Sequence, residues 1–417
     1  MNRRGWKTNE RKGTLPKHEQ SRHALVPECS PLRYEFVATR RRASPMIVTG
    51  FPHQVGGHIG LFTCAGHVCK PYDQRECAFY SQIGDQFTPF TAKFCGCVIV
   101  NVTEHPDRSL TLRTASPVKC HQTRRQAGDI PTFGDDGVHE AEEKAITFRV
   151  KECGKVEAKR VVNPFAVECQ SKSVEKLLDK GFNRCLMLLE DIVAKYRRPC
   201  VVDLKMGTRQ YGDDASPQKQ KRQTEKCEAS TSASLGVRMV GMQLLEDAGD
   251  CYSYINKHEG REMDSARFTA ALRKFLAMAD VPRCRKLLAK LERLREMLAL
   301  AEGYRFFSSS ILIAFDGANE TDEESLQAVV PMSKKRRRSE SYSSDEDTDT
   351  LEEPEVTVAD ISVRMIDFAH STFSGFLEDQ ERHKGPDEGY LLGIDTLLRI
   401  TKAFIEDAEG EDEDGAA

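Results

Sequence analysis

The sequence has no long hydrophobic run, a single tryptophan, and no cysteine pair at the Cys-x-x-Cys spacing. No apolar segment reaches the roughly 18 to 20 residues of a membrane-spanning helix, and the first residues, MNRRGWKTNERKG, lack the apolar core of a signal peptide. We therefore expect the protein to stay inside the cell. The 14 cysteines are scattered singly, and Cys95 and Cys97 lack partners at zinc-binding spacing. This pattern favours reduced thiols over a disulfide framework or a zinc site.

The composition is compatible with a folded core but does not indicate which kind of partner the protein binds. The chain has 417 residues, of which 39% are hydrophobic, and the length is compatible with two to three domains. The net charge of −4 conceals strong segregation of basic and acidic residues along the chain. The overall charge therefore says little about what the protein binds.

The pattern along the chain predicts an α+β protein with two lobes. Short strands broken by glycine (MIVTGF, GLFTC, HVCKP), the helical stretch CAFYSQI and the apolar CGCVIVNV indicate a small, mostly antiparallel first lobe. Helices are then predicted over 173–181, 267–278 and 284–300, and strands over 184–192 and 199–206. The chain is predicted to begin with a disordered basic arm over 1–45 and to end with an acidic tail over 406–417. Between them, the first lobe covers 46–190 and contains a loop insert over 103–145. The second lobe covers 191–405 and contains a disordered insert over 318–358.

The stretch from Pro199 to Gly207, PCVVDLKMG, is the most informative part of the chain. Successive side chains of a strand point to opposite faces, so Asp203 and Lys205 share one face, while Val202, Leu204 and Met206 form the apolar face. A strand that places a carboxylate beside an ammonium and then turns at Gly207 into a polar loop suits a site for charged ligands. Taken alone, the pair is equally compatible with a buried structural ion pair.

A polar helix follows this strand. Ser216 and Pro217 form a good helix start, because the serine side chain can cap exposed N–H groups and proline loses no donor at the first helical position. The next residues, QKQKRQTEKCE, have no apolar stripe. Lys219, Arg222 and Lys226 share one helical face. Such a helix is either solvated or lines a charged ligand.

These segments resemble the signature of the inositol polyphosphate kinase family. The motif P-x-x-x-D-x-K-x-G is followed by GTRQYGDDAS and CEASTSASLGVRMVGMQ, which are similar to the inositol hexakisphosphate kinase branch. Further blocks agree in order: PHQVGGH, RFFSSSILIAFDG, MIDFAH and GPDEGYLLGIDTLLRI. Together they cover most of residues 46–405. The chain departs from the branch at Tyr211, where His is common, at Phe165, where Trp follows Asn-Pro, and in two long inserts.

The resemblance implies an ATP site between the two lobes. It assigns Lys70 to the ATP phosphates, with Glu76 on the next helix as its ion-pair partner. It places the hinge that hydrogen-bonds adenine at Glu190 and Ile192, and it gives the ribose hydroxyls to Asp203, whose carboxylate can accept two hydrogen bonds. The Gly56–Gly57 turn could let backbone N–H groups approach phosphate.

The resemblance also implies the catalytic and metal-binding residues. Lys205 reaches the phosphates in transfer, and Asp367 is analogous to the kinase aspartate that holds Mg²⁺. His370 is a candidate contact to the acceptor, although a structural histidine is an equally good interpretation. ATP and Mg²⁺ are therefore the expected cofactors.

For the acceptor, the resemblance implies a pocket built from the polar helix, with Lys219, Arg222 and Lys226 as substrate-binding residues and Arg209 as a guanidinium fork beside them. The implied activity is ATP-dependent phosphorylation of inositol hexakisphosphate to a diphosphoinositol product, with the pentakisphosphate as a further candidate acceptor. A multikinase or trisphosphate 3-kinase of the same fold is the alternative activity, and CEASTSASLGVR argues against it.

The second insert points to location rather than chemistry. It contains the basic run from Lys334 to Arg338, followed by SESYSSDEDTDTLEEPE. The run is typical of nuclear localisation signals, which predicts an importin partner and residence in nucleus and cytoplasm. A nuclear scaffold or nucleic-acid-binding protein is the alternative of a different class. It would need basic side chains displayed on a folded surface, so we expect no direct nucleic-acid partner and no membrane partner.

Overall fold

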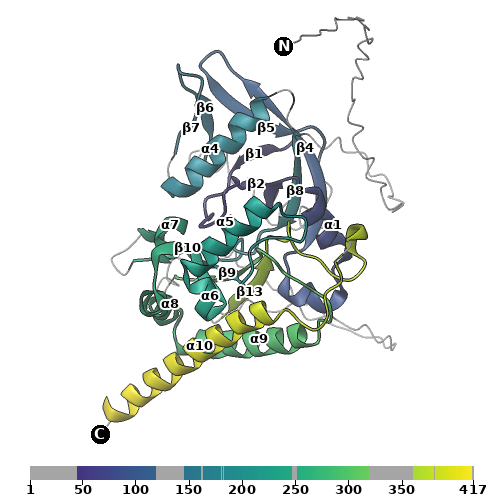
Figure 1. Cartoon of the computed structure of the whole chain (residues 1–417). Coiled ribbons are helices and arrows are strands. Elements are labelled where there is room, and N and C mark those ends of the chain that lie inside the picture. The colour runs from purple at the N-terminus through teal and green to yellow at the C-terminus, as the bar shows by residue number, and fades with distance from the viewer. Residues whose placement is uncertain are drawn as a thin grey trace, which may run out of the picture. The chain divides into compact units, whose positions relative to one another are not determined.

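A computed structural model describes most of the chain beyond its first 44 residues. The described residues are 45–118, 145–160, 163–179, 181, 183–246, 251–318, 360–379 and 381–415. They belong to one compact unit that spans 44–417 and mixes helices with two sheets, which confirms the predicted α+β class (Figure 1). The predicted arm, most of the second insert and the run from Lys334 to Arg338 lie outside these residues.

The first lobe is built on an eight-stranded sheet whose pairings are antiparallel. Its order is β1-β2-β3-β8-β4-β5-β6-β7, and β1 also pairs with β5. The strands predicted around the glycines are confirmed. The bounds are β1 (Ile47–Gly50), β2 (Phe62–Cys64), β3 (His67–Pro71), β4 (Phe94–Glu104), β5 (Ser109–Thr114), β6 (Phe148–Val150), β7 (Val156–Ala158) and β8 (Cys185–Glu190).

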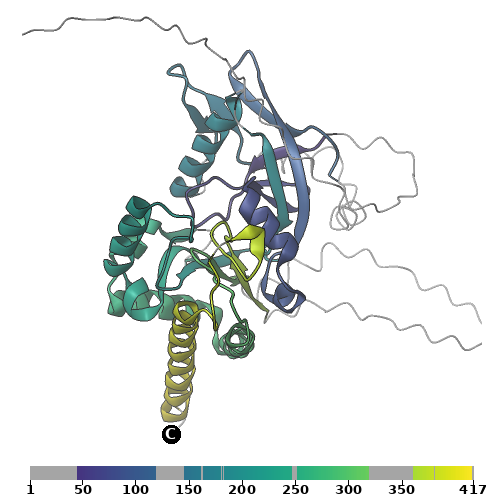
Figure 2. The ribbon, with the colours of Figure 1, turned by 45° about the vertical axis from the view of Figure 1, so that its right-hand side comes forward.

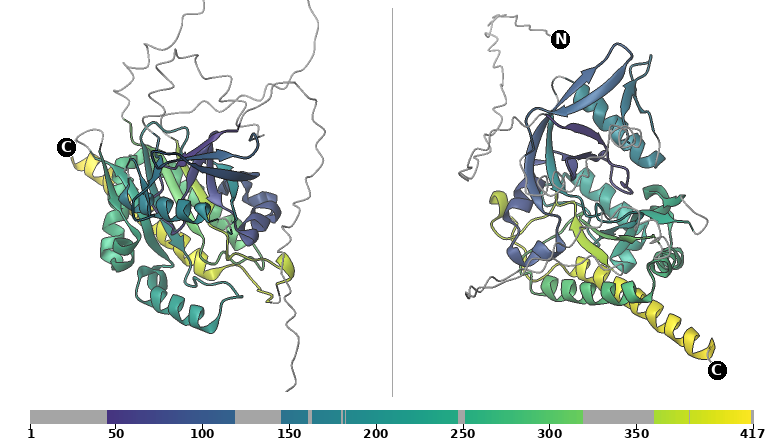
Figure 3. Two further views of the ribbon diagram at one scale, coloured as in Figure 1. Left: turned by 90° about the horizontal axis from the view of Figure 1, so that it is seen from above. Right: turned by 180° about the vertical axis from the view of Figure 1, so that it is seen from behind.

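The loop predicted over 103–145 was wrong at its start. Strand β4 continues to Glu104, and β5 returns beside it, so these residues form a hairpin that Figure 3 shows from behind. Leu110 and Leu112 are buried on the inner face of β5, while Arg113 is exposed. With only two strongly apolar residues in six, the alternation of β5 was too weak to reveal a strand. Residues 119–144 lie outside the described part.

Helices of the first lobe begin at capping residues. Asp73 caps α1 (Gln74–Gln82) by accepting from the Glu76 N–H, and η1 (Asp85–Phe90) follows it. Asn163 caps α4 (Pro164–Leu178), which has proline at its first position. The helix predicted over 173–181 therefore covered only the end of α4, because the start signal nine residues earlier was not used.

The second lobe centres on a five-stranded antiparallel sheet of order β11-β10-β9-β12-β13. Strand β9, which carries Asp203 and Lys205, lies in the middle, so both its edges are hydrogen-bonded and its position is tightly determined. The bounds are β9 (Pro199–Met206), β10 (Val237–Leu245), β11 (Tyr252–Ile255), β12 (Ser310–Asp316) and β13 (Ile361–Ile366).

Helices pack on one face of this sheet, α10 contacts α9, and the end of α10 projects beyond the other elements (Figure 2). The predicted acidic tail begins within α10. The helices are α5 (Pro217–Glu228), α6 (Thr231–Leu235), α7 (Lys257–Glu262), α8 (Ser265–Ala279), α9 (Val281–Ala299), η3 (Phe376–Glu378) and α10 (Glu388–Gly415). In the described ranges, no helix is both long and apolar enough to cross a membrane.

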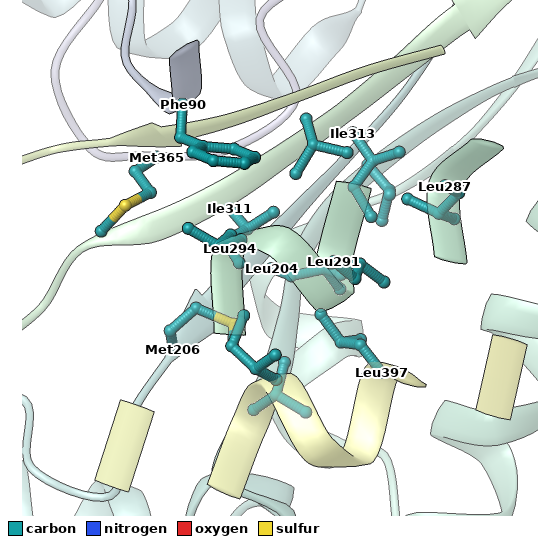
Figure 4. Packing of buried hydrophobic residues seen from close by; sticks show 14 of the residues in the cluster. Phe90, Leu204, Met206, Leu287, Leu291, Leu294, Ile311, Ile313, Met365 and Leu397 are labelled. Atoms are coloured by element: carbon teal, nitrogen blue, oxygen red, sulfur yellow. The ribbon is translucent and has the colours of Figure 1, made fainter. Parts of the chain in front are cut away.

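The core of the second lobe holds the apolar face of β9 against the helices. Leu204 and Met206 are fully buried and lie in one cluster with Leu291 and Leu294 of α9 and Leu397 of α10 (Figure 4). Each such side chain contributes about 1.5 to 3 kcal/mol through burial. The apolar face thereby anchors the strand, and its opposite face is left for a site.

Candidate active site

A cavity of about 310 Å³ is lined by residues of both lobes. This is within the usual range for a small-molecule site. The lining includes seven residues singled out in the sequence: Lys70, Glu190, Ile192, Asp203, Lys205, Asp367 and His370. The structure therefore brings together side chains that are up to 300 residues apart in the chain.

Strand β9 carries the central charged pair. Asp203 and Lys205 line the cavity, while Val202, Leu204 and Met206 are fully buried in the core behind them. The alternation predicted from the sequence is therefore confirmed. The two charged groups form no hydrogen bond or ion pair with each other, so the interpretation as a structural ion pair is wrong.

A partly buried ion cluster lies beside this pair. The Lys70 ammonium is 2.8 Å from the Glu76 carboxylate, as predicted, and 2.6 Å from Oδ1 of Asp367. Burial opposes the charge on Lys70, but the two carboxylates outweigh it and raise the pKa of Lys70. Burial would likewise raise the pKa of Asp367, but Lys70 and Lys205 lower it below its usual value. Lysine and aspartate are thus both held in their charged forms.

Helix α1 is fixed at this cluster by consecutive residues. Glu76 accepts from Lys70 and also from the Phe368 backbone N–H at 3.2 Å. Its neighbour Arg75 donates to the Ser371 carbonyl and to Asp379, at 3.0 Å for Oδ1. The helix is thereby tied to the segment that follows Asp367.

Asp203 is set up to receive hydrogen bonds. It is 4% exposed, and its Oδ1 atom has no hydrogen-bond partner among the described residues. Gly56 approaches it so closely that a Cβ there would lie 2.2 Å from Oδ2. Burial, followed by the charge of Asp367, raises the pKa of Asp203 to about 6. A ligand hydroxyl reaching Oδ1 would satisfy a buried oxygen whose isolation is costly.

Lys205 is a cation with no counter-ion in contact. Its ammonium makes no hydrogen bond or ion pair with any residue that the structure describes, although it lines the cavity. Burial is the main influence on it and lowers the pKa of Lys205. A partly desolvated ammonium without a partner favours an anionic ligand.

The connection between the two sheets lies along one wall of the cavity. Glu190 ends β8, and its backbone N–H donates to the Lys93 carbonyl at 2.9 Å. Ile192 follows in the turn that leads to β9, and its N–H has no hydrogen-bond acceptor among the described residues. Both residues line the cavity, and their role as an adenine-binding hinge stays a prediction.

Helix α5 begins as the sequence predicts. Ser216 Oγ accepts from the Lys219 N–H at 3.3 Å, and Pro217 is the first helical residue. The Lys219 ammonium lies 3.3 Å from Nε2 of His370, which lines the cavity. Burial, then the charge of Lys219, lowers the pKa of His370, so a neutral ring accepts from the lysine. The start of α5 therefore borders the cavity.

Arg222 and Lys226 lie farther along α5, outside the cavity lining. Burial and the charges of Arg261, Arg222, Arg238 and Lys257 lower the pKa of Lys226. Neither Arg222 nor Lys226 forms an ion pair with an acid in the described ranges. The helix therefore extends the cavity into an electropositive surface.

Arg209 is not where the sequence predicted it. Its guanidinium donates to Asp213 at 2.6 Å and is absent from the cavity lining, so the prediction of a substrate-binding fork is not supported. Instead Arg209 borders a separate hollow next to His383 and Gly389. The reason is local: the loop after β9 provides a carboxylate four residues away, which captures the guanidinium.

Sequence reasoning missed two basic residues at the site. His58 follows the Gly56–Gly57 turn and lines the cavity, and Arg238 of β10 is directly opposite Lys205 in the sheet. His58 lies within the quoted block PHQVGGH, so its motif was a usable signal. Arg238 could be placed only after the β9–β10 register was known.

Comparisons with known proteins agree with this geometry. The profile of the inositol polyphosphate kinase family matches residues 186–402. The chain is 34% identical to inositol hexakisphosphate kinase 1 of Rattus norvegicus, over 87% of this chain and 94% of the relative. The chain belongs to the inositol polyphosphate kinase family. It is also 30% identical to inositol hexakisphosphate kinase 2 of Homo sapiens, over 88% of this chain and 97% of that relative.

Among solved structures, the inositol phosphate multikinase Ipk2 of S. cerevisiae, in complex with ADP and Mn²⁺, is similar over 53% of this chain and 84% of that chain. Its sequence identity is 24% and its TM-score 0.40.

The two residues at which the chain departs from the motifs of the branch, Tyr211 and Phe165, each place a ring against a cation. The Tyr211 ring lies 4.5 Å from the Arg209 guanidinium carbon, and the Phe165 ring lies 4.9 Å from the Lys257 ammonium. Each of these two rings therefore makes a cation–π contact in this protein.

Proposed function

We propose that the protein transfers the γ-phosphoryl group of ATP to inositol hexakisphosphate and releases a diphosphoinositol product. This chain matches several relatives over almost their whole length, and these relatives are named inositol hexakisphosphate kinases. The observation that carries the proposal is the arrangement of charge around β9. A buried, paired cluster lies on one side, and unpaired cations of α5 lie on the other.

The paired side suits the nucleotide. Glu190 and Ile192 would bind adenine through backbone groups, and the unsatisfied Oδ1 of Asp203 would accept from ribose. Lys70 would contact the ATP phosphates, because its ammonium is held at the cavity by two carboxylates. Lys70 would act in the charged form that its two carboxylate partners favour.

Asp367 fits a divalent cation such as Mg²⁺. Its carboxylate is kept ionised by Lys70 and Lys205, and it lines the cavity beside them. No cluster of three or more metal-ligating side chains occurs in the part of the chain that the structure describes. This fits Mg²⁺, which is commonly held by one or two carboxylates together with nucleotide phosphates and water. Bound there, Mg²⁺ would neutralise charge on the transferred phosphoryl group.

Lys205 would act at the centre of the transfer. The acceptor is a phosphate oxygen that is already ionised, so the reaction needs little help from a general base. An acceptor oxygen forms a bond to the γ-phosphorus while the bond to the β,γ-bridging oxygen breaks, and ADP leaves. Lys205, unpaired and partly desolvated, would stabilise the negative charge shared by both phosphates.

The acceptor would lie against α5. Lys219 and His370 border the cavity, and Arg222 and Lys226 continue the positive surface. A highly phosphorylated ring needs several cations at once, since each charge-assisted hydrogen bond contributes about 1.5 to 3 kcal/mol.

Product analysis tests this proposal. Purified protein is incubated with ATP, Mg²⁺ and, separately, inositol tris-, pentakis- and hexakisphosphate, and the products are identified by NMR. A pyrophosphate formed from the hexakisphosphate supports the proposal. Monoester formation on the trisphosphate, with no turnover of the hexakisphosphate, would replace it with a multikinase or 3-kinase activity.

We also propose that the basic run from Lys334 to Arg338 binds an importin and places the protein in both nucleus and cytoplasm. The support is its sequence alone, because the run lies outside the described residues.

A further inference from the structure

Helix α5 has little apolar packing to hold it. Of its 12 residues only Cys227, near the end, is buried. Burial of one small side chain can anchor the end of the helix against α6. It cannot determine where the first turn lies, and this turn carries Lys219 beside His370. The start of α5 must be positioned by the loop that precedes it.

That loop, residues 207–216, contains a clamp of three side chains: Arg209, Asp213 and His383. Asp213 Oδ1 accepts from Arg209 at 2.6 Å, and its Oδ2 is 2.8 Å from Nε2 of His383. The exposed fractions of the side chains are 33%, 11% and 16%. Arg209 and His383 thus occupy both oxygens of a mostly buried carboxylate.

Aromatic contacts hold Arg209 in place. The guanidinium carbon lies 4.5 Å from the Tyr211 ring centroid and 4.1 Å from that of Phe307, and Nε donates to the Tyr211 carbonyl at 3.1 Å. The same Phe307 ring packs edge-on against His383, with centroids 5.7 Å apart. The clamp is therefore rigid, because each member has at least two partners.

The clamp joins the two segments that leave the catalytic strands. Asp213 follows β9, which carries Lys205, and His383 follows β13, which leads to Asp367. Gly212, next to Asp213, packs beside His370, since a Cβ on Gly212 would be in van der Waals contact with the His370 Cβ at 3.5 Å. Moving the loop would therefore shift the Lys219–His370 contact.

We infer that Arg209, Asp213 and His383 are positioning residues that hold the start of α5 against His370 and so set the geometry of acceptor binding. The inference rests on the proposed function of α5 as the acceptor helix. None of the three touches the reacting groups. The clamp acts through Lys219.

Kinetics of His383→Ala test the inference. The KM for inositol hexakisphosphate should rise about tenfold, which corresponds to ~1.4 kcal/mol, while the KM for ATP should change less than about twofold, because the nucleotide groups do not contact the clamp. His383→Gln should recover most of the loss, since its side-chain amide can donate to Asp213. His105→Ala, in the β4–β5 turn, is the matched control and should leave both KM values unchanged.

Arg209→Lys provides a second variant if His383→Ala folds poorly. It retains a cation for Asp213 but loses the planar stacking, so it should show a smaller rise in acceptor KM than Arg209→Ala. Equal changes in the ATP and acceptor KM values for both Arg209 variants would overturn the inference, because a general structural defect would act on both sites.

A double-mutant cycle separates this inference from the proposed function. If the clamp acts through Lys219, the effects of His383→Ala and Lys219→Ala on acceptor KM should be less than additive. Additive effects would overturn the clamp and leave the acceptor helix intact. Wild-type acceptor KM values in all of Lys219→Ala, Arg222→Ala and Lys226→Ala would refute the acceptor helix itself.

Discussion

Charged side chains are paired on one side of the cavity and unpaired on the other. On the nucleotide side, Lys70 contacts Glu76 at 2.8 Å and Asp367 at 2.6 Å, and Lys70 and Glu76 are largely shielded from solvent. On the acceptor side, Lys219, Arg222 and Lys226 project from a helix with one buried residue and have no ion pair with a described acid. Lys205 lies between the two sides.

The difference shows how far the geometry of each side is determined before ligands bind. A paired, desolvated cluster keeps its geometry without ligand, and removing one member leaves a buried charge uncompensated. Exposed, unpaired cations are solvated individually, and each contributes a separate and smaller amount when a polyanion binds. We therefore expect large effects from single substitutions at the first side and graded effects at the second.

The largest expected effect is at the central groups. Lys205→Ala and Asp367→Asn should each lower kcat about a thousandfold or more, because each removes charge that stabilises the transition state. Lys195→Ala and Asp395→Asn, whose charges pair elsewhere, are the matched controls. Steady-state kinetics on variants checked for folding by circular dichroism measure this. More than a tenth of wild-type turnover in either variant contradicts its role.

Graded effects are expected along α5. Lys219→Ala, Arg222→Ala and Lys226→Ala should each weaken acceptor binding by about 1.5 to 3 kcal/mol, the scale of a hydrogen bond to a charged group, with little change in ATP affinity. Lys221→Ala on the same helix is the control, because Lys221 is exposed and lies near Glu225. If all three variants keep the wild-type acceptor KM, α5 is only a solvated helix.

Substitution of Asp203 is expected to stabilise the folded protein, whereas the substitutions above weaken catalysis or binding. Its folded pKa of about 6 exceeds the unfolded value of ~3.9, so the native state binds more protons between these values and stability falls as the pH rises through that window. At pH 7, Asp203→Asn should therefore increase the free energy of unfolding of the nucleotide-free protein by ~1 to 3 kcal/mol. Its Tm should rise accordingly.

Thermal denaturation at several pH values measures this effect. The difference in Tm between Asp203→Asn and wild type should shrink as the pH falls from about 6 to below ~3.9, where the wild-type carboxyl becomes protonated in both states. A difference that is independent of pH would show that ionisation of Asp203 does not destabilise the native state.

The smallest expected effect on catalysis comes from the second insert. Phe315 of β12 and Ile361 of β13 are directly paired, so the strands on either side of the insert are neighbours and a short Gly/Ser linker can join them. Replacing the segment from about Ala318 to Thr357 should leave kcat and Tm near wild type and shift the protein from nucleus to cytoplasm, as measured by microscopy. Lost catalysis would show a structural role, and an unchanged distribution would remove the localisation role.

Much of the site could be predicted because its signals are local. Alternation along β9 placed Asp203 and Lys205 on one face, and Ser216 with Pro217 marked the start of α5. Strand β5 of the β4–β5 hairpin was missed because it has only two strongly apolar residues. Roles at Lys70 and Asp367 came from family resemblance, since nothing local in their sequence reports a contact between residues 297 positions apart.

The sequence by itself determined the faces of strands, the starts of helices and the family, because these depend on the order of neighbouring residues. Only the tertiary structure decided which charges are paired. Arg209 and Lys205 both looked like ligand-binding cations, yet Arg209 is captured by Asp213, whereas Lys205 meets no acid among the described residues. Partner choice depends on distances between segments that folding brings together. A sequence motif does not contain those distances.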